Sequence, residues 1–135
     1  MIVVLDTNII VSAILQTDSS CGRILQLALD GALSAACNSG MYAEYEEVLL
    51  RRKFWPVHEQ ARIILERISK DWIHVSTEPL LIALPDPKDL PFLETAAAVR
   101  ADALITGNLR HFPVWARQGI EVLNPREFMD QLYHS

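Results

Sequence analysis

The first ten residues, Met1-Ile2-Val3-Val4-Leu5-Asp6-Thr7-Asn8-Ile9-Ile10, decide the fold class of this chain. Residues 2–5 form an uninterrupted apolar run rich in β-branched side chains, which is typical of a strand buried on both faces of a sheet. Thr7 or Asn8 can cap a helix that follows. Asp6 therefore lies where a buried strand ends and a helix begins, and in open α/β sheets sites are built at that edge.

Short apolar runs and amphipathic segments alternate through the rest of the chain. We expect strands at 2–5, 33–37, 72–76, 103–106 and 120–123, and helices at 9–15, 21–29, 40–53, 56–70, 90–100 and 125–132. This alternation predicts a parallel sheet with helices on both faces. The sequence contains no linker or repeat, so residues 1–135 are expected to form a single α/β domain.

The composition is that of an ordinary globular domain, with 50% hydrophobic and 21% charged residues. No apolar run is long enough to span a membrane, and no signal peptide precedes the first strand, so we expect a cytoplasmic protein. Cys21 and Cys37 are accordingly expected to be reduced, buried thiols. The net charge of −5 disfavours a protein that binds nucleic acid by neutralising its backbone. It does not exclude an enzyme whose acids hold a metal ion, because the ion reverses their local charge.

Glu44 is the first acid after Asp6 that we expect near the same edge of the sheet. In the expected helix 40–53, an apolar stripe is formed by Met41, Tyr45, Val48 and Leu49. Glu44 lies closer to this stripe than Glu46 or Glu47, and it falls early in the helix. The alternative is a solvated acid stabilised by the helix dipole.

Asp86 and Asp89 bracket Pro87 just before the expected helix 90–100. Turn formation explains Asp86 and helix capping explains Asp89 without any function. Two acids three residues apart, following a strand-like run, also suit a hard cation that takes oxygen ligands. Both interpretations stay open from the sequence.

Asn108 follows the expected strand 103–106, so it also falls at a carboxyl end of the sheet. It is either a turn residue that tolerates left-handed geometry or a neutral oxygen ligand. With Asp6, Glu44 and the pair Asp86 and Asp89, four separate segments are expected to meet at one edge.

These segments resemble the motifs of the PIN-domain ribonuclease family, and the resemblance covers essentially the whole chain. They are Val-Leu-Asp-Thr-Asn at 4–8, Tyr-Ala-Glu-Tyr-Glu-Glu-Val-Leu at 42–49, Asp-Pro-Lys-Asp-Leu-Pro-Phe-Leu-Glu at 86–94, Leu-Ile-Thr-Gly-Asn at 104–108 and Asn-Pro-Arg-Glu-Phe at 124–128. The chain is most similar to PIN proteins regarded as toxins of toxin–antitoxin pairs. The resemblance implies a single α/β/α sandwich with a central parallel sheet, and an endoribonuclease dependent on Mg²⁺ or Mn²⁺. It also implies RNA as substrate, a cognate antitoxin as partner and, as is common in the family, a homodimer.

Carried over by position, the resemblance assigns metal binding and catalysis to Asp6, Glu44 and Asp89. Asp86 is similar to an additional acid of this branch. Asn8, Thr106 and Asn108 are expected to support the site. Many family members carry Asp where this chain has Asn108, so the number of metal ions is left open. Arg110, next to this edge, is the expected contact for a substrate phosphate.

Two other functions stay open from the sequence. The first is a catalytically impaired PIN-fold module that acts by binding proteins, because Asn108 removes one charge from the site. The second is a metal-dependent phosphatase with Asp6 as nucleophile. That chemistry requires a second acid two residues on, where this chain has Asn8, so the phosphatase is the weakest of the three hypotheses.

Overall fold

Five strands pair in parallel in the computed structural model, which describes residues 1–134. They are β1 (Ile2–Leu5), β2 (Ser34–Cys37), β3 (Ile73–His74), β4 (Ala103–Ile105) and β5 (Val122–Leu123). Their order across the sheet is β3-β2-β1-β4-β5, with β1 in the centre. All four pairings are parallel, as predicted.

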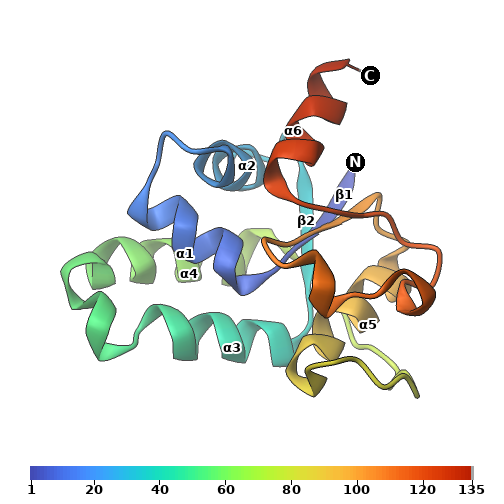
Figure 1. The fold of residues 1–135 in the computed structure, drawn as a ribbon. Helices are drawn as coiled ribbons and strands as arrows, with labels where there is room; N and C mark the ends of the chain where they lie inside the picture. Colours follow the sequence, from blue (N-terminus) through green and yellow to red (C-terminus); the bar gives the residue numbers. More distant parts are fainter. Residues whose placement is uncertain (135) are drawn as a thin grey trace.

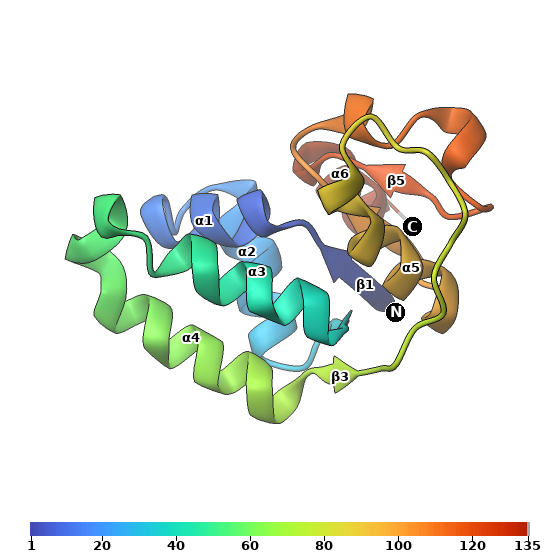
Figure 2. The ribbon, with the colours of Figure 1, turned by 90° about the horizontal axis from the view of Figure 1, so that it is seen from below.

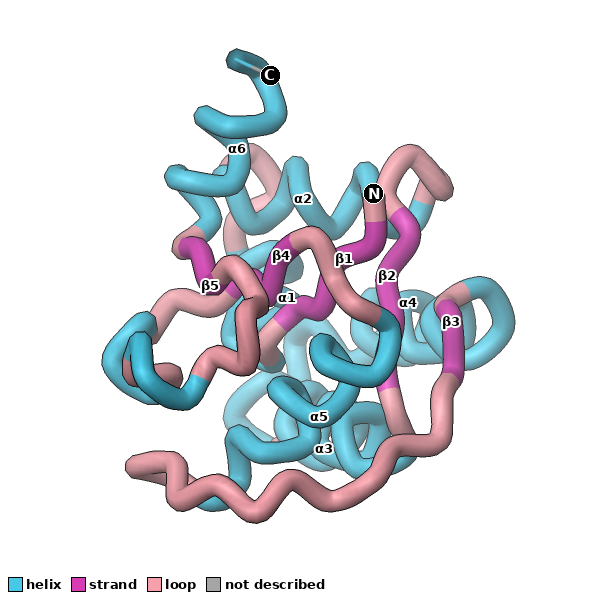
Figure 3. The backbone as a smooth tube through the Cα atoms, turned by 90° about the vertical axis from the view of Figure 1, so that its right-hand side faces the viewer, coloured by secondary structure: helices cyan, strands magenta, loops and turns pink. Residues whose placement is uncertain are grey.

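Helices cover both faces of this sheet (Figures 1 and 3). They are α1 (Thr7–Leu15), α2 (Ser20–Leu29), α3 (Ser39–Leu49), α4 (His58–Asp71), α5 (Leu90–Val99) and α6 (Pro125–His134). Helix α5 packs on β1, β2 and β4, whereas α6 packs on β4 and β5 from the other face, beside α2. Seen from below, α3 and α4 run side by side along one flank (Figure 2). The architecture is the expected α/β/α sandwich.

The central strand is buried on both faces, as its apolar run predicts. Val3, Val4 and Leu5 are fully inaccessible to solvent. Parallel pairing places Leu5 beside Ile105 of β4. The residues that follow these two positions, Asp6 and Thr106, therefore leave the sheet next to each other.

Several boundaries differ from those expected. Asp6 itself caps α1, because its side chain accepts from the backbone N–H of Thr7, so the helix begins two residues earlier than predicted. Helix α3 ends at Leu49 rather than at residue 53, and a 3₁₀ turn (Arg52–Val57) separates it from α4. Pro56 lies inside that turn instead of opening α4.

Both cysteines are free. Cys37 is buried in β2, and burial raises the pKa of its thiol to about 11. Cys21 is only half-buried, in contrast to the expectation, because it lies in the first turn of α2. None of the helices within residues 1–134 is long and apolar enough to cross a bilayer.

Gly22 is required by a close approach between the first turn of α2 and the preceding loop. A Cβ at this position would lie 2.1 Å from the backbone oxygen of Thr17. We therefore expect Gly22→Ala to lower the free energy of unfolding by about 1–3 kcal/mol, measured by urea denaturation. Gly107→Ala is the control, since a Cβ there meets no atom within 4 Å. Equal stability of the two variants would contradict this account of Gly22.

Candidate active site at the carboxyl edge of the sheet

Asp6 is fixed by two hydrogen bonds at the end of β1. One carboxylate oxygen accepts from the backbone N–H of Thr7 at 2.8 Å, and the other accepts from Oγ1 of Thr106 at 2.7 Å. Both Asp6 and Thr106 are buried. The backbone N–H of Asp6 donates to the carbonyl of Ile105 at 2.9 Å, which continues the sheet pairing. The parallel register therefore sets the orientation of the Asp6 carboxylate.

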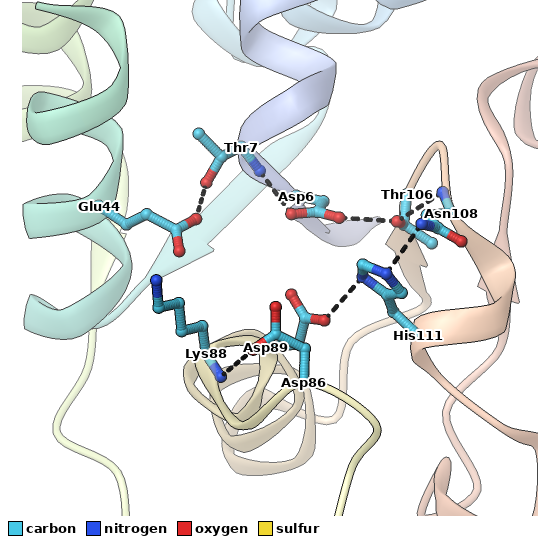
Figure 4. A network of polar contacts seen from close by, with 9 residues as sticks. All are labelled: Asp6, Thr7, Glu44, Asp86, Lys88, Asp89, Thr106, Asn108 and His111. Atoms are coloured by element: carbon cyan, nitrogen blue, oxygen red, sulfur yellow. Dashed lines mark hydrogen bonds and ion pairs between the residues drawn. The ribbon is translucent and has the colours of Figure 1, made fainter. Parts of the chain in front are cut away.

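Glu44 reaches the same edge from α3. The hydroxyl of Thr7 donates to its carboxylate and the backbone N–H of Thr7 donates to Asp6, so this one threonine links the two acids (Figure 4). Glu44 is half-buried, while Glu46 and Glu47 are exposed. Glu44 is therefore the least exposed of the three glutamates, as the helical pattern predicts. Glu47 pairs with Arg51 at 2.8 Å.

Asp86 and Asp89 differ in what their side chains do. Asp86 accepts from the backbone N–H of Lys88 at 3.0 Å, which is the turn role expected from the sequence. Asp89 precedes α5 but makes no capping hydrogen bond with its side chain. Its Oδ2 is buried without a hydrogen bond, although it lies 2.9 Å from Nδ1 of His111. Helix capping therefore does not explain Asp89.

Asn108 follows β4, and its backbone N–H donates to Oγ1 of Thr106 at 3.0 Å. Its side-chain nitrogen lies 2.9 Å from Nε2 of His111. Neither Thr7 nor His111 was assigned to the site from the sequence. His111 could be inferred to lie near the site from its position three residues after Asn108. The two residues share one 3₁₀ turn, which spans Leu109–His111 and has Asn108 as its cap.

Two further predicted residues lie outside this network of contacts. Asn8 is exposed in the first turn of α1, between the buried residues Thr7 and Ile9. Arg110 is exposed on the 3₁₀ turn between Asn108 and His111. Arg110 is thus next in sequence to a residue of the site and accessible to solvent.

The four acids surround one space, and the pKa values of Asp6, Glu44 and Asp89 are raised there (Figure 4). Burial raises the pKa of Asp6 against the lowering effect of its two hydrogen bonds. Burial raises the pKa of Glu44, and the charges of Asp6 and Asp86 add to this effect. Burial, followed by the charge of Asp6, raises the pKa of Asp89 to about 6. Raised pKa values favour the protonated form of a carboxyl group, so a site of this kind without a metal ion favours retention of a proton.

The metal-free site should make stability depend on pH through Asp89. Its folded-state pKa of about 6 exceeds the ordinary value of 3.8. Its contribution to stability is thus fully present below about pH 4 and lost as the pH rises through about 6. We expect Asp89→Asn, which cannot titrate, to gain up to about 3 kcal/mol in unfolding free energy relative to wild type between these pH values. Urea unfolding in EDTA measures this difference, and a difference that does not change with pH would contradict the assignment.

The side chains fit a hard cation by their chemistry rather than by a preformed cage. Carboxylate and amide oxygens are the ligands that Mg²⁺ and Mn²⁺ prefer. The carboxylate of Asp89 makes no helix-capping hydrogen bond, so it can act as an acceptor for a cation. Within residues 1–134, no group of three or more His, Cys, Asp or Glu side chains stands ready to hold a metal ion.

The comparisons with known proteins agree with this fold. The family model described as PIN domain matches residues 2–110. A chain of VapBC2 from Rickettsia felis, in a structure bound to a DNA fragment from its promoter, is similar with a TM-score of 0.59 and 23% identity. The match covers 92% of this chain and 98% of that chain. A chain of FitAB bound to the IR36 DNA fragment has a TM-score of 0.58 and 20% identity, covering 91% of this chain and 94% of that chain. At these identities the two structures show a common fold. A comparison with curated proteins found no significant match.

Proposed function

The chain belongs to the PIN domain family, whose members are generally nucleases, and we propose that it is an endoribonuclease that hydrolyses RNA phosphodiester bonds with Mg²⁺ or Mn²⁺. The observation that carries this proposal is the meeting of acids from three distant segments at one edge of the sheet. Asp6, Glu44 and Asp89 come from the end of β1, from α3 and from the start of α5. Such a set of mutually repelling, partly buried acids is costly without a counterion.

In this proposal Asp6, Glu44 and Asp89 hold the metal ion, and Asp86 assists them. Thr106 and the backbone of Thr7 keep the Asp6 carboxylate oriented, and the hydroxyl of Thr7 keeps Glu44 turned toward it. Asn8 and Asn108 support the site from its rim. When bound, the ion would lower the pKa of a water molecule and neutralise charge that develops on the phosphate.

The direct test is incubation of the purified protein with a mixed pool of single-stranded and structured RNA. We expect cleavage in the presence of MnCl₂ or MgCl₂ and its loss in EDTA. DNA of the same sequences, assayed in parallel, tests the preference for RNA. Cleavage that EDTA does not affect would contradict the metal dependence.

A protein-binding module with an impaired centre is the alternative. Asn108 carries a neutral amide, which contacts His111 through its nitrogen, and this position adds no negative charge to the site. The module predicts that Mn²⁺ neither binds to the protein nor supports cleavage of any RNA in the pool. The two hypotheses therefore predict opposite results in one titration.

We further propose that the protein acts in the cytoplasm as the toxin of a toxin–antitoxin pair. The structural neighbours VapBC2 and FitAB are toxin–antitoxin complexes, which supports an antitoxin protein as partner.

A homodimer is also proposed, on the basis of the family resemblance, and analytical ultracentrifugation of the purified protein tests it.

Expression without the antitoxin is expected to arrest growth, and coexpression with the product of a short neighbouring reading frame is expected to restore it. Normal growth without any such partner would contradict the toxin assignment.

Arg110 is proposed to contact a phosphate of the substrate, because it is exposed and adjacent to the site. Arg110→Ala is therefore expected to raise KM for RNA about 5–20-fold, the loss of one charged hydrogen bond. Its affinity for Mn²⁺, measured by calorimetry, should equal that of wild type. A fall in kcat with unchanged KM would show that Arg110 has a different role.

A further inference from the structure

His111 joins two residues of the site that come from different parts of the chain. Its Nδ1 lies 2.9 Å from Oδ2 of Asp89, and its Nε2 lies 2.9 Å from the side-chain nitrogen of Asn108 (Figure 4). Asp89 precedes α5, and Asn108 follows β4. The imidazole ring therefore spans the gap between the start of a helix and the end of a strand.

Hydrogen bonds and burial hold the loop that carries His111 in place. The N–H of His111 donates to the carbonyl of Asn108 at 3.1 Å. The next residue, Phe112, is fully buried, and its carbonyl accepts from Nε of Arg117 at 2.8 Å. The loop that carries the ring is thus held by its own contacts, whereas the side chain of Asp89 has no helix-capping hydrogen bond to fix it.

The direction of these contacts determines where the ring carries its proton. The amide nitrogen of Asn108 can only donate, so Nε2 of His111 is the acceptor in this contact and Nδ1 is the nitrogen that can donate. That nitrogen faces Asp89. Among residues 1–134, His111 is the side chain that contacts the Asp89 carboxylate at ion-pair distance.

We propose that His111 is a positioning residue of the acidic site, which holds the Asp89 carboxylate toward Asp6 and Glu44 through its Nδ1. This inference rests on the proposed metal-dependent function. It assigns to the imidazole ring of His111 the link between Asp89 and the turn at Asn108. The partners of metal-binding side chains orient them, and loss of such a partner typically weakens metal binding about 10–100-fold.

Mn²⁺ affinity, measured by isothermal titration calorimetry, tests this role without relying on activity. His111→Ala removes both ring contacts and is expected to weaken Mn²⁺ binding about 10–100-fold. His111→Asn places an amide nitrogen near the position of Nδ1, so it should retain affinity within about threefold of wild type. His111→Gln places its amide near the position of Nε2 instead, so it should bind as weakly as His111→Ala.

His58→Ala is the matched control, because His58 contacts the carbonyl of Arg51 beyond the far end of α3. It is expected to bind Mn²⁺ like wild type. Thermal unfolding of each variant separates loss of folding from loss of affinity. The inference is overturned if folded His111→Ala binds Mn²⁺ within about twofold of wild type, or if His111→Asn and His111→Gln are equally weakened. Absence of Mn²⁺ binding by wild type would instead overturn the proposed function, and this inference with it.

Discussion

Asp6→Asn is expected to reduce metal-dependent RNA cleavage by at least about 100-fold while the protein remains folded. Asp6 is the most central of the acids, since it ends the middle strand of the sheet. An amide at this position cannot supply the negative charge that the proposed metal site needs. The loss should appear in cleavage rate and in Mn²⁺ affinity together.

The fold should tolerate this substitution because an amide can satisfy both partners of Asp6. Its oxygen can accept from the backbone N–H of Thr7, and its nitrogen can donate to Oγ1 of Thr106. The substitution also removes a carboxyl group whose pKa is raised by burial. We therefore expect Asp6→Asn to have a Tm equal to or higher than that of metal-free wild type.

Asp130→Asn, on the exposed side of α6, is the matched control for this experiment. It removes one carboxylate from the chain but none from the site, so its cleavage rate should equal that of wild type. Cleavage by Asp6→Asn at the wild-type rate would refute the assignment of Asp6. Rate assays and thermal unfolding on the same preparations are required.

Tyr45→Ala is expected to lower the free energy of unfolding by about 3–5 kcal/mol. Tyr45 is fully buried in α3, and its ring packs edge-on against Trp72 with their centroids 6.2 Å apart. Its hydroxyl donates to the carbonyl of Leu5 at 2.5 Å. Tyr45 therefore ties α3, which carries Glu44, to the residue just before Asp6.

Tyr45→Phe separates the hydrogen bond from the packing. It retains the ring and leaves the buried Leu5 carbonyl without this donor, so a loss of about 1–2 kcal/mol is expected. Tyr133→Ala is the control for tyrosine removal, since Tyr133 is 64% exposed; it should cost less than about 1 kcal/mol. Urea denaturation measures all three variants. A loss of less than about 1 kcal/mol in Tyr45→Ala would show that this contact does not hold α3 to β1.

The strands and helices could be predicted because burial dictates their residue patterns. The run at 2–5 is apolar on both faces because helices cover both faces of β1. The relative exposure of Glu44, Glu46 and Glu47 follows from helical periodicity alone. The α/β/α sandwich follows from the alternation of these segments.

The contacts between the site residues could not be predicted in the same way. Asp89 has the position of a helix cap, and its side chain is nevertheless turned toward His111. That contact joins the start of α5 to the loop after β4, and no local pattern encodes a pairing over 22 residues, the difference between positions 89 and 111. The bond from Thr7 to Glu44 likewise depends on how α3 packs beside α1. Such pairings are set by tertiary packing, which periodicity does not specify.

The most direct test of the central claim is the location of Mn²⁺ by anomalous X-ray scattering from crystals grown with MnCl₂. The account predicts a peak between the side chains of Asp6, Glu44 and Asp89, within about 2.5 Å of carboxylate oxygens. A peak only at other positions, or no peak in crystals at millimolar Mn²⁺, would contradict a metal site at this edge of the sheet.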